Sequence, residues 1–136
     1  MQSKLEGWSE KYELGIEEID LQHHYFLDLI ARLSKELQSS NDHSYHKSLF
    51  IELGLYTHFH FISEENLMYR ASFPGLKEHK KLHNQLIDGL NRNKLLFEDG
   101  YIQALQVVEF LELWFLNHTV GEDRKFADFL KKSEQD

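Results

Sequence analysis

Histidine and carboxylate residues recur at helical spacing in this chain. His79 and His83 lie four residues apart, and His60 and Glu64 repeat that spacing. On an α-helix a four-residue step stacks two side chains on one face, where both can bind the same metal ion. Three further residues of these types are His23, His118 and Asp123. The chain therefore holds seven potential metal ligands of imidazole and carboxylate type.

The elements that must position these residues are separated by segments rich in helix-breaking residues. Such segments lie at 38–42, 71–75 and 98–100, and Asn41 or Asp42 can cap the helix that follows the first of them. Apolar residues between the breaks recur with helical period. We expect an all-α fold, an up-down-up-down antiparallel four-helix bundle. The expected parts of this single domain, 1–136, are an irregular N-terminal arm at about 1–17, bundle helices at 18–38, 42–70, 76–97 and 101–119, and a short C-terminal helix at 124–132.

Six of the potential ligands fall on the inward faces of these helices. Antiparallel packing would bring them to one end of the bundle, where an unpaired carboxylate such as Glu64 would cost several kcal/mol. A cation between the side chains would turn that cost into ligand bonds. Seven ligands exceed the four of a single zinc site and suit two ions, and the mixture of imidazole and carboxylate favours iron, manganese or zinc.

Other residues are predicted to have structural roles only. The remaining histidines point away from the inward faces or lie near a loop, so we expect His24, His43, His46 and His58 at the surface or at the rim of the core. Tyr56 and Trp114 are expected in the core, and Trp8 and Tyr12 are expected to pack on the bundle from the arm.

The spacing of His118 and Asp123 does not fit a regular helix. Five residues turn an α-helix by 500°, which leaves the two side chains about 140° apart. Both can face the same metal pair only if the helix ends or bulges between them. We therefore predict a terminus or bulge at 119–122, permitted by Gly121.

The composition excludes several classes of function. The chain has 136 residues and no cysteine, which rules out disulfides, thiolate zinc sites, iron–sulfur clusters and cysteine nucleophiles. Its formal net charge of −8 argues against nucleic acid as a partner. The first residues lack the apolar stretch of a secretory signal, and the most apolar stretch, 107–116, contains two glutamates. We expect a cytoplasmic protein without a membrane partner.

Together these residues resemble the hemerythrin family in its single-domain bacterial form. The similarity covers nearly the whole chain, and all seven ligand positions of the family are filled. The residues that carry it are Trp8, Gly15-Ile16, Ile19-Asp20-Leu21-Gln22-His23, the run from Tyr56 to Glu65, Phe73-Pro74, His79 and His83, Trp114, and His118 with Asp123.

The resemblance implies a non-haem di-iron centre with an oxo or hydroxo bridge. One iron would be bound by His79, His83 and His118, the other by His23 and His60, with Glu64 and Asp123 as bridging ligands. Dioxygen would bind end-on, as a hydroperoxide, at the iron with two histidines.

The residues beside this centre are expected to control its oxidation. Leu27, Phe61 and Trp114 are expected to line the oxygen pocket. The family commonly has an aliphatic residue after the last histidine, where this chain has Thr119. A more polar pocket with faster oxidation to the inert diferric form is the expected consequence.

The function implied is reversible O2 binding for storage, delivery or buffering, by a protein that is not an enzyme. The carboxylate-poor ligand set also favours binding a diatomic over attacking a substrate. Three alternatives remain open: a module that senses O2 or nitric oxide, a di-iron oxidoreductase acting on peroxide or nitric oxide, and a structural zinc protein. We expect a stand-alone monomer, because no length remains for an output domain, with a possible partner protein that receives O2.

Overall fold

The computed structural model describes residues 9–135 of the chain, and those residues form helices and no strand. A 3-10 turn at Glu10–Tyr12 precedes the first long helix. The helices are α1 (Glu17–Ser39), α2 (His43–Arg70), α3 (Leu76–Glu98), α4 (Ala104–Phe115) and α5 (Arg124–Gln135), with a π-helical segment (Leu116–Asp123) joining α4 to α5. The prediction of an all-α chain is confirmed.

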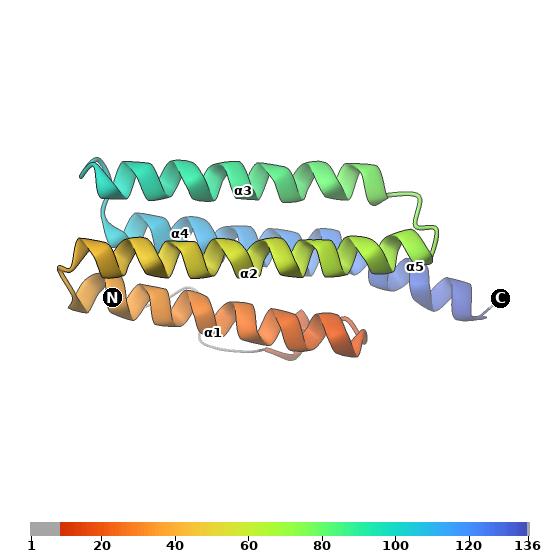
Figure 1. Ribbon diagram of the computed structural model, residues 1–136. Helices are drawn as coiled ribbons and strands as arrows, with labels where there is room; N and C mark the ends of the chain where they lie inside the picture. The colour runs from red at the N-terminus through yellow and green to blue at the C-terminus, as the bar shows by residue number, and fades with distance from the viewer. Residues whose placement is uncertain (1–8, 136) are drawn as a thin grey trace.

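Helices α1, α2, α3 and α4 form an antiparallel bundle (Figure 1). Helices α1 and α3 each pack against both α2 and α4, so the four surround a common core. The π-helical segment continues the direction of α4, and α5 extends past the end of the bundle where α2 turns into α3 (Figure 1). The four-helix architecture expected from the apolar spacing is therefore confirmed.

Hydrogen bonds from capping side chains determine where α2 and α4 begin. Asp42 caps α2, because its Oδ1 accepts hydrogen bonds from the backbone N–H groups of Ser44 (3.0 Å) and Tyr45 (3.2 Å). Helix α4 begins at Ala104 and not at 101, which corrects the expected boundary. The reason is a capping box in which the Gln106 side chain accepts from the backbone N–H of Gln103 at 2.8 Å.

The prediction that His46 lies at the surface is wrong. Its side chain is buried, and its ring lies 5.6 Å from that of Phe97 on α3. The error arises because α2 already faces the core in its first turn, so position 46 lies on the same face as Leu49 and Leu53. The other three histidines expected at the surface, His24, His43 and His58, are exposed.

The tryptophan and tyrosine residues that were predicted to have structural roles lie close to where they were expected. Tyr12 is buried with its ring edge-on to Phe115 at 5.5 Å, whereas Trp8 lies outside the described residues. Tyr56 and Trp114 are partly buried against the main apolar core. Between residues 9 and 135, no helix combines the length and apolar character that crossing a membrane requires.

Candidate metal centre

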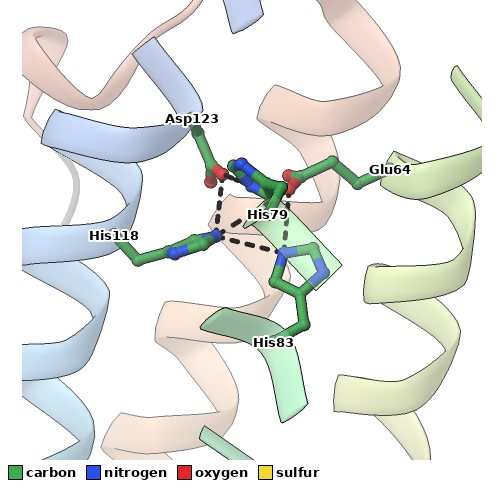
Figure 2. A group of neighbouring side chains, drawn as sticks. All are labelled: Glu64, His79, His83, His118 and Asp123. Atoms are coloured by element: carbon green, nitrogen blue, oxygen red, sulfur yellow. Dashed lines mark hydrogen bonds and ion pairs between the residues drawn. The ribbon is translucent and has the colours of Figure 1, made fainter. Parts of the chain in front are cut away.

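The seven predicted ligands converge inside the bundle, near the end where α2 turns into α3. Each is at most 4% exposed, although all seven are polar. They come from α1 (His23), α2 (His60 and Glu64), α3 (His79 and His83) and the π-helical segment (His118 and Asp123). Figure 2 shows five of them, with the rings of the three histidines from α3 and the π-helical segment turned toward the two carboxylates. The structure thus brings together every residue that the sequence singled out.

Glu64 turns its two oxygens toward different histidines. Its Oε1 lies 2.8 Å from Nε2 of His79 and 3.1 Å from Nε2 of His83. Its Oε2 lies 3.8 Å from Nε2 of His23 and 3.7 Å from Nε2 of His60. One carboxylate therefore stands between two sets of imidazoles.

Asp123 repeats this arrangement from the opposite wall. Its Oδ1 lies 2.8 Å from Nε2 of His79 and 2.9 Å from Nε2 of His118. Its Oδ2 lies 3.2 Å from Nε2 of His23. We call His79, His83 and His118 the three-histidine group, and His23 and His60 the two-histidine group. Both carboxylates offer one oxygen to each group.

The ligand atoms are close enough to hold metal ions. Within each of two sets, one ligand atom per residue lies within 4.8 Å of all the others. The first set is the three-histidine group with Glu64 and Asp123, and the second is the two-histidine group with Glu64. Because the sets share a carboxylate, the arrangement fits a pair of neighbouring ions better than one ion.

The π-helical segment explains how His118 and Asp123 reach the same place. A π-helix closes its hydrogen bonds after five residues, so residues five apart lie on nearly the same face, as residues four apart do in an α-helix. The predicted bulge between 119 and 122 is confirmed. The role given to Gly121 is not, because its φ lies outside the left-handed region and an added Cβ would meet no atom within 4 Å.

Two residues that sequence reasoning missed fix the orientation of the histidine rings. Nδ1 of His60 lies 2.7 Å from Oε1 of Gln22, whose amide in turn donates to Oγ of Ser63 at 3.0 Å. Nδ1 of His83 lies 2.7 Å from Oε2 of Glu65. Since both acceptors hold the ring proton on Nδ1, Nε2 is left with a lone pair directed into the site. Both residues lie next to a ligand within the stretches that carry the family resemblance, but no spacing rule assigns them this orienting role.

Burial and the two carboxylates act against each other on the histidine pKa values. Burial lowers the pKa of His60 to about 3, because the neighbouring carboxylates only partly offset the loss of water. Burial also acts to lower the pKa of His79 and His118, but hydrogen bonds and charge from Asp123 and Glu64 outweigh it and raise both to about 9.

The carboxylates respond in the opposite sense. Burial alone would raise the pKa of Asp123 and of Glu64, but the surrounding imidazoles hold both below their usual range. Two buried negative charges therefore persist at neutral pH, balanced by the protonated rings of His79 and His118, and a metal cation could take over that role.

Several buried polar atoms of the site lack a hydrogen-bond partner among residues 9–135. They are both ring nitrogens of His23, Oε2 of Glu64 and Oδ2 of Asp123. Nε2 of His23 and Oδ2 of Asp123 are close but do not have hydrogen-bond geometry. Each unpaired buried group costs about 1–3 kcal/mol. Because Nε2 of His23 and the two carboxylate oxygens face the same small region, a cation there would satisfy all three, and the residues fit a bound metal.

Aromatic side chains form walls around the ligands. Phe61 stacks on His83 at 3.7 Å between ring centroids, and Trp114 stacks on His118 at 4.2 Å. Phe115 meets the ring of His23 edge-on at 5.7 Å. Beside His118, Thr119 is 1% exposed, and its hydroxyl has no partner within the described part of the chain.

A four-helix bundle with five imidazoles and two carboxylates in its interior defines a class of helical metal-binding proteins. Residues 14–130 match the family model described as the hemerythrin HHE cation binding domain. The chain belongs to the hemerythrin family, as its motifs suggested.

Similar proteins from bacteria and from an animal align with most of the length of this chain. It is 30% identical to a bacteriohemerythrin of Stenotrophomonas maltophilia over 124 residues, which cover 91% of this chain and 80% of that protein. A bacteriohemerythrin of Clostridium acetobutylicum is 30% identical over 129 residues, 89% of this chain and 98% of that protein. A myohemerythrin of Riftia pachyptila is 24% identical, with 88% of both chains covered.

Proposed function

We propose that this protein binds O2 reversibly at a pair of iron ions held by the seven ligands. The observation that carries the proposal is that Glu64 and Asp123 each direct one oxygen to the three-histidine group and the other oxygen to the two-histidine group. Bridging carboxylates of this kind would hold two ions side by side. A ferrous pair held there would supply the two electrons that O2 takes up when it binds and gives back when it is released.

The unequal histidine groups give the centre an open side. The three-histidine group and the two carboxylates would offer five ligands to one ion, whereas the two-histidine group and the same carboxylates would offer four to the other. The ion held by His23 and His60 would therefore have one protein ligand fewer, and we assign O2 binding to that side. Phe115 and Phe26 contact these two rings and present apolar surface there.

The protein around the centre favours binding over catalysis. The ligands are buried and their walls are aromatic, which would limit the access of water and the loss of bound O2 in its reduced, peroxide-level form. Five of the seven ligands are neutral donors, so the site offers only two negative charges to stabilise strongly oxidised iron. We therefore favour an O2 carrier or buffer over a di-iron oxidoreductase, with sensing of O2 or nitric oxide as a use of the same binding step.

A spectroscopic cycle tests this function. The full-length protein is loaded with iron, its metal content is measured, and it is reduced without air before O2 is admitted and then removed. We expect two irons per chain and visible charge-transfer bands that appear with O2 and disappear on its removal. Bands that do not reverse, or turnover of added peroxide, would support an oxidoreductase. Tight zinc binding without bands would contradict the iron centre.

A further inference from the structure

Helix α2 is apolar on two opposite faces. Its inner face carries core residues and the ligands His60 and Glu64. Its outer face carries five large apolar side chains, which we call the outer α2 stripe. These are Ile51 (49% exposed), Leu55 (67%), Phe59 (57%), Ile62 (56%) and Tyr69 (76%).

The regularity of the outer α2 stripe separates it from scattered exposed residues. At 100° per residue, its five members fall within about 80° of the helix circumference, and they span about 27 Å along the axis. Single exposed apolar residues are normal on protein surfaces, but a row of this length marks an interaction site, and Asn66 is the one exposed polar residue within its arc between positions 51 and 69. The fold does not need this row, because the opposite face of α2 already fills the core.

The patch continues from α2 onto α1. The ring of Tyr56 lies 6.0 Å from Phe59 and 4.8 Å from Tyr25, so the three rings form a connected aromatic surface across the two helices. Tyr25 is 46% exposed, and Leu21, one turn earlier on α1, is 63% exposed.

We propose that the outer α2 stripe is the interface of a homodimer in which two copies of this chain pack α2 against α2 about a two-fold axis. The five stripe residues with Leu21 and Tyr25 expose on the order of 800 Å² of side chain, at roughly 200 Å² for each one fully exposed. A standard protein interface buries about 800 Å² on each partner. The patch therefore has the size that one half of a stable dimer requires. The proposed dimer differs from the monomer expected from the sequence.

Charge favours a second copy over a membrane surface. The positions of α2 beside the stripe carry Lys47 and Arg70 against Glu52 and Glu65, and those of α1 beside Leu21 and Tyr25 carry Arg32 against Glu17, Glu18 and Asp28, which places −2 of the chain's −8 on this face. A second copy therefore meets little repulsion along α2 itself, where the charges sum to zero. An interfacial membrane helix would instead carry an excess of Lys and Arg beside its apolar face. A two-fold axis also pairs the stripe with itself, so one surface serves both partners.

Sedimentation equilibrium of the full-length, iron-loaded protein between about 1 and 100 μM tests the dimer. We expect a dimer for the natural sequence and a dissociation constant raised roughly a hundredfold by Leu55→Glu, which places unpaired charge in the interface. Leu95→Glu is the matched control, because Leu95 is 58% exposed but lies on α3. It should leave the dimer unchanged, and all three proteins should keep the same helix content and iron stoichiometry.

A cross-linking experiment locates the contact independently. Because the chain contains no cysteine, Phe59→Cys, at the stripe position nearest the middle of 51–69, introduces a single thiol. Mild oxidation should link two Phe59→Cys chains through the interface and leave Leu95→Cys chains largely unlinked. A natural protein that stays monomeric at 100 μM overturns the proposal, including the case where the stripe instead binds lipid vesicles. A dimer that Leu55→Glu does not weaken overturns it as well.

Discussion

Replacing Gln22 by leucine should weaken one half of the metal centre and spare the other. Oε1 of Gln22 accepts a hydrogen bond from Nδ1–H of His60 at 2.7 Å, and the Gln22 amide nitrogen donates to Oγ of Ser63. Leucine has a similar size but no acceptor, so the His60 ring would lose the contact that fixes its tautomer and orientation. His60 is one of only two histidines available to the second ion, which makes that ion the more sensitive one.

The size of the effect follows from the role of such orienting contacts. Loss of a hydrogen bond behind a metal-binding histidine typically costs 10–100-fold in metal affinity, which corresponds to about 1.4–2.7 kcal/mol. Anaerobic titration of the metal-free protein with Fe(II), in competition with a chelator, should show two ions bound by the natural protein. In Gln22→Leu, the affinity for one ion should fall by this factor while the other stays within about twofold.

Two further variants make the result specific. Glu65→Leu removes the partner of His83 Nδ1, so it should weaken the ion of the three-histidine group. Gln85→Leu changes an exposed glutamine on α3 and should alter neither affinity. Equal loss of both ions in Gln22→Leu, or no loss at all, would refute the assignment of Gln22 to the two-histidine side.

Three more outcomes are expected. His118→Ala should lose metal or oxidise irreversibly in the O2 cycle, whereas His43→Ala, at an exposed position, should behave as the natural protein; identical behaviour would contradict the ligand assignment. Thr119→Val removes a buried hydroxyl without a partner, so thermal unfolding should show about 1 kcal/mol more stability, and oxidation to the diferric form should slow; a fall in the melting temperature would mean that the hydroxyl is satisfied. Metal loading at pH 7 should release about two protons, because His79 and His118, with pKa about 9, carry protons that ligands must lose. That release should fall as pH rises through 9, and calorimetry in buffers of different ionisation enthalpy measures it.

The bundle was predictable because helix breaks and apolar spacing are local signals. The breaks at 38–42, 71–75 and 98–100 separate four stretches whose apolar residues repeat with helical period, and the antiparallel order follows from the short connections. The signal fails at helix starts. Position 46 faces the core because the Asp42 cap starts α2 one turn before it, so residue 46 is already helical and lies on the inner face. Helix α4 begins at Ala104 because of a hydrogen bond between two glutamine residues.

The orienting contacts of the site could not be read from the sequence. Gln22 and Glu65 act through hydrogen bonds to a histidine on a neighbouring helix, across 38 and 18 residues of chain. Periodicity within one helix carries no information about such pairs. The outer α2 stripe was not predicted, for a related reason. The inward row of apolar residues already explains α2 as a core helix, so the apolar residues on its other side carry no separate signal.

The π-helical segment is what allows both carboxylates to lie between the two histidine groups. In a regular α-helix, Asp123 would point about 140° away from His118, and its two oxygens could not face Nε2 of His79 and of His23. The five-residue turn places Oδ1 within 2.9 Å of His118 and 2.8 Å of His79, while Oδ2 stays 3.2 Å from His23. Without that turn, Glu64 would be the only carboxylate between the groups, and the second ion would keep three protein ligands. The local break in helical geometry thus decides whether this bundle can hold a tightly bridged metal pair.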